Sequence, residues 1–363
     1  MNTPNAAPRL AETAGTPPIA RLAPIAITMG DPAGIGPEIV AMLFQQRPEW
    51  SQRCLVVGHL PTLRRAAAIT AGAAGPLPVA VLERATSLAG FPPRCLPVLP
   101  LPSACTEPFP LGRVNAAAGE AAAAAIEWAA RAALRGDVSA VVTAPIHKEA
   151  LAAAGRPYPG HTELLQALAA EHHGVTPAQM PVRMMLSNPD LRTVLHTIHV
   201  PLRQAIDALT VPSLLETLRI TATHFERFFP QPGRPCRIGV AGLNPHAGEG
   251  GLLGREEIDT VSPAVAQARA AGLDVHGPEA PDTIFMRARQ GAFDVVVALY
   301  HDQGLIPVKL LGLDDGVNTT LGLPFVRTSP DHGTAFDLAG TGRASPRSLM
   351  AAVETAMAYA APP

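Results

Sequence analysis

Short apolar runs alternate along the chain with longer stretches of helical character. The runs lie at 25–29, 138–142, 192–198, 237–243 and 293–299, and each ends in a loop of glycine, proline or polar residues. Apolar runs of this length, rich in β-branched residues and bounded by turn residues, are typical of buried strands. Because they alternate with helical stretches, they predict an α/β protein with a largely parallel sheet.

Longer segments of the sequence predict helices. Residues 115–135 are rich in alanine, with charged residues at intervals, and indicate a surface helix. Segments 261–271 and 346–359 have a similar character. A domain takes roughly 150 residues, so a chain of 363 residues suggests two domains.

The charge of the chain is nearly balanced, with 28 lysines and arginines against 30 aspartates and glutamates. No long basic run is present, which argues against a dedicated nucleic-acid-binding protein, whose phosphate contacts need clustered cations. Only Lys148 and Lys309 are lysines; every other basic residue is an arginine. A guanidinium does not replace a compact ammonium at every site, so these two positions are candidates for a specific role.

The cysteines and the N-terminus bear on the compartment. The four cysteines form no CxxC pair, which argues against a disulfide framework or a cysteine-based zinc site and favours a reducing compartment. Residues 1–20 lack the apolar core of a signal peptide and predict a disordered tail. No apolar run approaches the ~20 residues of a membrane span. We therefore expect a soluble cytoplasmic protein that binds neither membrane nor nucleic acid.

Three histidines follow predicted strands. His199, His246 and His301 each come directly after a strand or within a few residues of its end. In open α/β sheets, side chains from separate strands converge in the crevice at the carboxyl ends of the strands. Three imidazoles and an open position would suit Zn²⁺ or a similar divalent ion that acts as a Lewis acid. Spacing alone leaves open that these are scattered loop histidines.

Other polar residues indicate a phosphate pocket. Lys309, Asn318 and Arg327 lie close together in an otherwise apolar segment, and an ammonium, an amide and a guanidinium together suit a phosphate. His161 and Thr162 offer two more donors if they face the same crevice. Alternatively, Thr162 caps the helix that follows it.

The glycine-rich loop at 30–38 has two interpretations. Its glycines and the following helix N-terminus could bring the backbone close to an anionic ligand. A plain tight turn explains the same residues. The spacing fits neither a P-loop nor a dinucleotide fingerprint.

The chain resembles the 4-hydroxythreonine-4-phosphate dehydrogenase family. The motifs GDPAGIGPE, PGHTELL, NPHAGEGG, YHDQG and LGLPFVRTSPDHGTAFDLAG occur in the family's order, and the resemblance runs from Ile25 to the C-terminal helix. It implies an isocitrate/isopropylmalate dehydrogenase-like fold, with two α/β/α domains and the active site in the cleft between them. It also implies a homodimer whose active site is completed by the partner subunit.

The domain division follows from this resemblance. We expect a first domain, on the cofactor side, from residues 21–140 and 320–363. A second domain at 141–319 is expected to carry the metal, the substrate and the dimer interface.

The same resemblance assigns roles to individual residues. The family's metal ligands fall on His199, His246 and His301. Its substrate-binding residues fall on His161, Thr162, Lys309, Asn318 and Arg327. Asp282 matches an acidic position near the metal and is the candidate general base, and the loop at Gly333, Thr334 and Ala335 is similar to the fold's adenosine-binding loop and is assigned to NAD.

The implied reaction is an oxidative decarboxylation. The family oxidises the secondary hydroxyl of 4-phosphohydroxy-L-threonine with NAD or NADP, and a divalent metal (Zn, Mg or Co) stabilises the charge that develops on the oxygen. The product, 2-amino-3-oxo-4-phosphooxybutanoate, loses CO₂ to give 3-amino-1-hydroxyacetone 1-phosphate, a precursor of pyridoxal phosphate (vitamin B6).

Paralogues of the family provide the alternatives. One group acts on D-threonate or D-erythronate 4-phosphate, and a more distant one on an aromatic cis-dihydrodiol carboxylate. The complete set of phosphate-site residues favours a phosphorylated substrate, whereas Asp31, Leu252 and Leu253 are shared with paralogues and leave the exact substrate open. A non-catalytic sensor on the same fold would be expected to have lost a ligand or a phosphate contact, and none is lost.

Overall fold

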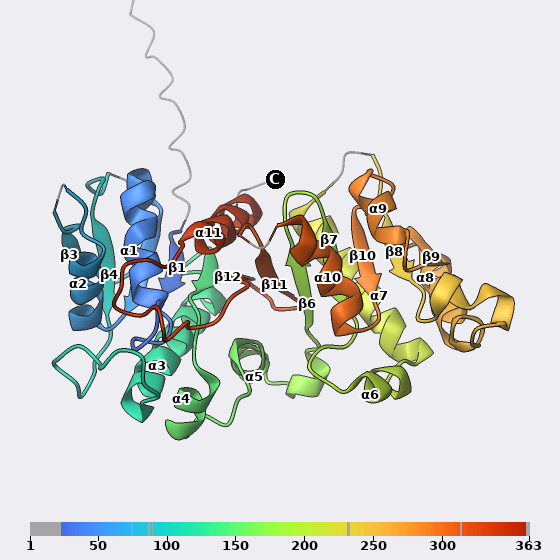
Figure 1. Ribbon diagram of the computed structural model, residues 1–363, viewed down its shortest axis with the longest axis horizontal. Coiled ribbons are helices and arrows are strands. Elements are labelled where there is room, and N and C mark those ends of the chain that lie inside the picture. Colours follow the sequence, from blue (N-terminus) through green and yellow to red (C-terminus); the bar gives the residue numbers. More distant parts are fainter. Residues whose placement is uncertain are drawn as a thin grey trace, which may run out of the picture.

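A computed structural model describes residues 23–73, 75–85, 88, 90–230, 233–312 and 314–360 of the chain. The predicted tail at 1–20 lies outside these residues. Within them, the strands form one sheet that runs the length of the molecule (Figure 1). The order across the sheet is β3 (Val79–Val81), β4 (Leu96–Pro100), β2 (Cys54–Gly58), β1 (Ile25–Thr28), β5 (Ala140–Thr143), β12 (Val326–Pro330), β11 (Val317–Leu321), β6 (Arg183–Ser187), β7 (Arg192–Leu195), β10 (Val295–Ala298), β8 (Ile238–Ala241) and β9 (Val275–Glu279).

Most neighbouring strands in this sheet run parallel. The exceptions lie in the middle, where β11 is antiparallel to β12 and β6, and β6 is antiparallel to β7. The prediction of an α/β protein with a mostly parallel sheet is therefore confirmed. The apolar runs seen in the sequence become β1, β5, β7, β8 and β10, whereas β6, β11 and β12 in the centre of the sheet were not singled out.

Helices connect these strands. The α-helices are α1 (Gly36–Gln46), α2 (Leu60–Ile69), α3 (Ala116–Leu134), α4 (Lys148–Ala153), α5 (His161–His173), α6 (Leu202–Asp207), α7 (Val211–Phe228), α8 (Ser262–Ala270), α9 (Ile284–Arg289), α10 (His301–Leu311) and α11 (Arg347–Ala360). Short 3-10 segments lie at η1 (Pro48–Gln52), η2 (Pro177–Gln179) and η3 (Pro245–Gly251), and η4 (Glu257–Val261) is a π-helix. The three predicted helices are confirmed as α3, α8 and α11.

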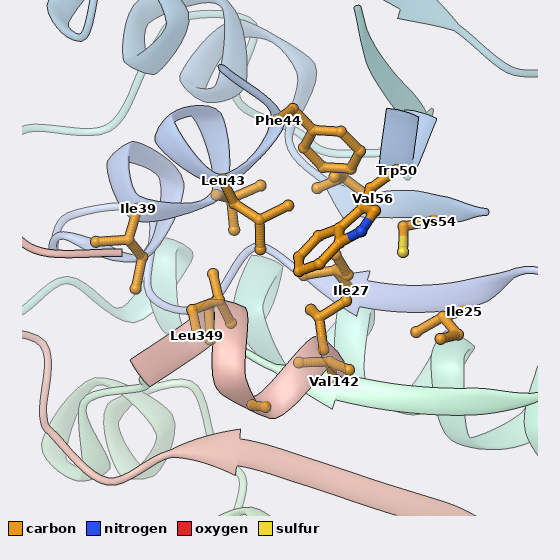
Figure 2. Packing of buried hydrophobic residues seen from close by; sticks show 14 of the residues in the cluster. Ile25, Ile27, Ile39, Leu43, Phe44, Trp50, Cys54, Val56, Val142 and Leu349 are labelled. Atoms are coloured by element: carbon orange, nitrogen blue, oxygen red, sulfur yellow. The ribbon is translucent and has the colours of Figure 1, made fainter. Parts of the chain in front are cut away.

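The first half of the sheet is buried on both faces. Successive residues of a strand point to opposite faces, so Ile25 and Ile27 of β1 pack toward α1 and α11, and Ala26 packs toward α3. Figure 2 shows the first of these layers, in which Phe44 of α1, the Trp50 ring and residues of β1 and β2 meet. Burial on both faces explains why this strand reads as a continuous apolar run.

The second half of the sheet repeats this arrangement. Val194 of β7 packs in a cluster with residues of α7 and α8, and its neighbour Leu195 packs on the other face with residues of α9 and α10. Each half of the long sheet therefore carries its own pair of hydrophobic layers. The domain limits placed near residues 140 and 320 stay a prediction.

Helix α3 is less superficial than predicted. Asn115 caps it by accepting hydrogen bonds from the backbone N–H of Ala117 and Ala118, but its alanine face is buried against the sheet and α4. A Cβ at Gly119 would lie 2.0 Å from the carbonyl oxygen of Ala150. The small residues therefore allow close packing of two helices, and only the charged face of α3 is at the surface.

A buried histidine makes stability depend on pH. His224 of α7 is 7% exposed, lies 4.9 Å from the Phe228 ring and 5.5 Å from the Tyr359 ring, and has no hydrogen-bond partner for Nε2 among the described residues. Burial, and then the charge of Arg227, lowers its pKa to about 3. The unfolded chain therefore binds the proton more tightly, and stability is lost as the pH falls from about 6.5 toward the folded pKa.

We expect His224→Phe to remove this pH dependence. In the parent protein the free energy of unfolding should fall by about 2 kcal/mol between pH 6.5 and pH 5 through this residue alone. Urea denaturation at both pH values measures the difference for the two proteins. An equal fall in both would show that His224 does not bind the proton on unfolding.

Candidate active site

A cavity of about 430 Å³ lies where β5, β12 and the loop after β7 come together. Its lining includes four of the residues predicted to bind substrate: His161, Thr162, Asn318 and Arg327. His199 and Gly333 line the same cavity. The fold therefore gathers residues that are up to 172 positions apart in the sequence, counted from His161 to Gly333.

Arg327 supplies a buried positive charge to this cavity. It is 3% exposed and donates hydrogen bonds to the hydroxyls of Thr320 (3.0 Å) and Thr143 (2.8 Å), and its Nε has no partner among the described residues. Burial lowers its pKa to about 10, and the charge of Glu163 acts in the opposite direction. The guanidinium therefore stays charged at neutral pH, and its hydrogen bonds do not neutralise it.

His161 and Thr162 stand at the start of α5, on the cavity wall. The helix cap is Gly160, and no side chain caps it, so the alternative role of Thr162 as a cap is wrong. Burial, and then the charge of Arg327, lowers the pKa of His161 well below its usual value. Nε2 of His161 and Oδ1 of Asn318 have no hydrogen-bond partner among the described residues. These unpaired polar atoms beside a buried guanidinium fit a polar anionic ligand.

Lys309 lies outside the lining of this cavity. Its Nζ forms an ion pair with the carboxylate of Asp331 at 2.9 Å, and Asp331 is itself part of the cavity wall. Since Asp331 follows β12 and Lys309 lies in α10, the ion pair joins the two halves of the molecule at the edge of the cavity. Its predicted contact with substrate stays a prediction.

Two of the three predicted metal ligands lie together. The rings of His199 and His301 are 5.7 Å apart, and both residues line a hollow of about 300 Å³ next to the first cavity. Burial, and then the charges of Lys148 and His301, lowers the pKa of His199. Nδ1 of His301 lies 2.7 Å from Oδ1 of Asp302. A neutral imidazole and one oriented by a carboxylate suit a divalent metal.

His246 does not join this pair within one chain. It lies exposed in η3, and in the part of the chain that the structure describes no three histidine, cysteine or acidic side chains are grouped to hold a metal ion. The backbone of η3 is unusual, because every residue from His246 to Gly250 has a positive φ, between 44° and 77°. Three of these residues are not glycine, so the loop needs external support to hold this conformation.

Glu257 of η4 supplies that support. It is 2% exposed and accepts hydrogen bonds from the backbone N–H of Leu243 and Asn244, both at 2.7 Å, and from the Asn244 side chain at 2.9 Å. A Cβ at Gly248 would lie 2.7 Å from a Glu257 oxygen, so the carboxylate also requires glycine at that point of the loop.

Glu257→Ala is expected to destabilise the His246 loop and the fold. It leaves three donors without their acceptor, which we expect to cost about 2–4 kcal/mol of unfolding free energy, measurable by urea denaturation. Glu256→Ala is the matched control, because the neighbouring Glu256 accepts a hydrogen bond from the Asn244 side chain, at 2.7 Å, and none from the backbone of Leu243 or Asn244. Equal losses in the two variants would contradict the role given to Glu257.

The remaining predicted residues are placed in different ways. Asp282 is exposed just before α9 and lines neither of the two cavities described above. Gly333 and Ala335 line a further, more apolar hollow of about 250 Å³. The carbonyl oxygen of Thr334 accepts a hydrogen bond from the Ile35 N–H at 3.0 Å. The predicted cofactor loop is therefore held by the glycine-rich loop 30–38.

The loop at 30–38 has a structural role in this chain. Gly34 lets it approach the loop at 333–335, because a Cβ there would lie 2.9 Å from the Thr334 carbonyl oxygen. Glu38 accepts hydrogen bonds from Gly340 and Gly342. Asp31 is 1% exposed and accepts a hydrogen bond from the Ala33 N–H, so it shapes its own turn and does not line the 430 Å³ cavity.

Sequence reasoning missed two charged residues in the cavity wall, Glu163 and Asp331. A third, Lys148, was a candidate for a specific role, but the sequence showed no partner for it. Glu163 and Asp331 stand inside the motifs PGHTELL and SPDHGTA, so their neighbours in the sequence were the available signal.

Comparison with known proteins identifies the family of this chain. The model of the family described as "Pyridoxal phosphate biosynthetic protein PdxA" matches residues 50–356. The chain belongs to this family. The resemblance found in the sequence is thereby confirmed.

Relatives in the PdxA family match this chain over nearly their whole length. The chain is 51% identical to the 4-hydroxythreonine-4-phosphate dehydrogenase of Beijerinckia indica subsp. indica, over 93% of this chain and 94% of that protein. It is 44% identical to the D-threonate 4-phosphate dehydrogenase of Salmonella typhimurium, over 93% and 98%. The crystal structure of the Klebsiella pneumoniae 4-hydroxythreonine-4-phosphate dehydrogenase superposes with a TM-score of 0.82 at 43% identity, covering 93% of this chain and all of that one.

Membership of the PdxA family makes the protein an enzyme, a dehydrogenase of the oxidoreductase class in pyridoxal phosphate biosynthesis. A dehydrogenase of this family implies a nicotinamide cofactor. Across the described ranges, no helix is both long and apolar enough to span a membrane.

Proposed function

We propose that this enzyme oxidises 4-phosphohydroxy-L-threonine to 2-amino-3-oxo-4-phosphooxybutanoate with NAD or NADP and a divalent metal. The product then loses CO₂ to give 3-amino-1-hydroxyacetone 1-phosphate. The observation that carries the proposal is the buried Arg327 guanidinium, which lines a cavity with unpaired polar atoms and, in the part of the chain that the structure describes, forms no ion pair with a carboxylate. A phosphate group would supply the missing negative charge.

Arg327, His161, Thr162 and Asn318 would hold the substrate phosphate. The guanidinium and the threonine hydroxyl would donate hydrogen bonds to its oxygens. The neutral imidazole of His161 would donate one when its proton is on Nε2, which has no partner among the described residues. Lys309 would add a charge from the cavity edge while Asp331 holds its position. The phosphate thus fixes one end of the substrate and leaves its hydroxyl to be oriented by the histidines.

His199 and His301 would provide two ligands for the divalent ion, and we assign the third to His246 of a second copy of the chain. A divalent ion bound there supplies Lewis acidity that favours loss of the substrate hydroxyl proton. Zn, Mg and Co are the candidates for this ion. The shared site explains why His246 is exposed and lies apart from the other two within one chain.

Exposed apolar side chains near the His246 loop and on α10 support a homodimer. Leu252 and Leu253, which follow the His246 loop, are 79% and 43% exposed, and Ile306 and Leu310 of α10 are 55% and 82% exposed. A surface of this kind is typical of a protein interface. Asp282 follows β9, which contacts η3, so it would reach the partner's site together with His246 and act there as the general base.

The cofactor would bind along the loop of Gly333, Thr334 and Ala335. The apolar hollow next to this loop opens beside the substrate cavity, since Asp331, His332 and Gly333 line both. The apolar lining suits an adenine ring, and the shared wall would bring the nicotinamide toward the substrate. The free thiols of all four cysteines fit the cytoplasm as the proposed compartment.

The sequence alternative, D-threonate or D-erythronate 4-phosphate, shares the phosphate that Arg327 would bind. The relative in Salmonella typhimurium, 44% identical, is named for the first of these substrates. A dihydrodiol carboxylate lacks the phosphate, and the corresponding enzyme of Burkholderia xenovorans is 30% identical with a TM-score of 0.62.

The decisive experiment compares these substrates directly. Purified enzyme with Zn²⁺, Mg²⁺ or Co²⁺ receives NAD or NADP and each four-carbon phosphate in turn, and NADH or NADPH formation gives kcat/KM. We expect the highest value with 4-phosphohydroxy-L-threonine. A higher value with D-threonate 4-phosphate would transfer the function to the alternative, and no turnover with any phosphate would refute the proposal.

A further inference from the structure

Lys148 places a positive charge in the cavity wall, and the proposed function gives this residue no role. It is the first residue of α4, directly after the loop that leaves β5, and it lines the cavity with Arg327 and His199. Among the described residues, no carboxylate lies within ion-pair distance of its ammonium, although Glu163 lines the same cavity. The other lysine of the chain, Lys309, is paired with Asp331.

The two cations of the cavity wall act on different histidines of the same wall. The charge of Arg327 acts on His161, at the phosphate end, whereas the charge of Lys148 acts on His199, at the metal end. A substrate held by its phosphate at Arg327 would therefore extend toward Lys148. The group at the far end of 4-phosphohydroxy-L-threonine is the carboxylate. It is attached to the carbon next to the one that carries the oxidised hydroxyl.

We propose that Lys148 binds the substrate carboxylate. This inference rests on the proposed function, which leaves one anionic group of the substrate without a protein partner. A charge-assisted hydrogen bond between ammonium and carboxylate would fix the second end of the substrate and would exclude compounds without a carboxylate. A lysine suits this role because its compact charge needs no bidentate geometry, in a chain that uses arginine almost everywhere else.

The test compares the substrate with 3-amino-2-hydroxypropyl phosphate, which has the same phosphate, hydroxyl and amine but no carboxylate. Oxidation of either compound transfers one hydride from the carbon to the nicotinamide cofactor and releases the hydroxyl proton, and calorimetry gives their dissociation constants without turnover. The parent enzyme should bind the substrate about tenfold to a hundredfold more tightly than this analogue, as expected for one charged hydrogen bond.

Lys148→Met should abolish that difference. Its affinity for the substrate should fall to the level of the analogue, and its affinity for the analogue should be unchanged. Lys148→Arg keeps the charge and should retain more of the difference than Lys148→Met. Lys309→Met is the matched control, since a residue that contacts the phosphate weakens both compounds by the same factor.

Two outcomes would overturn the role of Lys148. If Lys148→Met weakens both compounds equally, the ammonium does not distinguish the carboxylate, and if it weakens neither, Lys148 does not contact the substrate. Unchanged melting temperatures would show that both variants are folded. If the parent enzyme neither binds nor oxidises either compound, the proposed function itself is wrong and the assignment of Lys148 falls with it.

Discussion

Mixing His246→Ala and His199→Ala variants is expected to restore about one quarter of the parent turnover, because half of the dimers formed are mixed and each has one complete site. Each variant alone should lose turnover on the order of a thousandfold, since a Lewis acid contributes several kcal/mol to the transition state. The mixture is dissociated and reassembled at equal concentrations, and NADH formation is measured with 4-phosphohydroxy-L-threonine.

The expected recovery depends on where each ligand comes from. In a mixed dimer, one site takes His199 from one subunit and His246 from the other, and both are intact. If all three histidines acted within one chain, neither site of the mixed dimer would be complete. The absence of recovery would therefore refute the shared site.

A second mixture is the control. His199 and His301 lie 5.7 Å apart in one chain, so His199→Ala and His301→Ala damage the same half of the site. Mixing these two variants should restore no turnover. Metal content, measured by elemental analysis of the gel-filtered proteins, should be low in each single variant and about half of the parent value per site in the first mixed dimer.

Replacement of Arg327 is expected to have the second-largest effect. Arg327→Met removes the buried charge that the phosphate would neutralise, and KM for the phosphorylated substrate should rise on the order of a hundredfold, equivalent to about 2–3 kcal/mol. The unfolding free energy should be unchanged or higher, because the free protein no longer buries a charge whose hydrogen bonds go only to hydroxyls. Steady-state kinetics and urea denaturation measure the two effects.

Arg183→Met provides the matched control for Arg327. Arg183 stands in β6, donates to the hydroxyl of Thr217 at 2.8 Å and forms an ion pair with Glu216, and it does not line the cavity. Its loss should lower stability and leave KM unchanged. Weak inhibition of the parent by inorganic phosphate should disappear in Arg327→Met and persist in Arg183→Met; the reverse pattern would place the phosphate elsewhere.

The sequence pattern predicted several strands that are buried on both faces. All residues of β1 and β10 are buried, and all of them except Thr28 are apolar, so these runs are visible without any knowledge of their neighbours. β11 and β12 carry Asn318, Arg327 and several threonines because they form the cavity wall, and this polar content hid them as strands. The polar residues that form the cavity wall therefore made β11 and β12 hard to recognise as strands.

The sequence predicted which polar residue types would bind a phosphate. It did not predict how these residues are arranged. Arg327 and Asn318 suggested a phosphate pocket from their composition alone, and the structure brings them into one cavity with His161. Lys309 looked equivalent in the sequence, yet α10 places it against Asp331 at the edge. Proximity along the chain could not show which of the three residues line the cavity. Lys309 lies in a helix and the other two lie in strands, and helices and strands direct their side chains differently.

The sequence by itself determined the α/β class, the mostly parallel sheet and the family, because apolar periodicity and ordered motifs are properties of the chain alone. Only the tertiary structure decided that Arg327 and Lys148 line the cavity without an ion pair to any carboxylate among the described residues. It also decided that Glu257 supports the left-handed loop of His246, apart from the other two histidines. Burial and charge pairing depend on which distant segments meet, and that is fixed by the packing of the sheet and its helices.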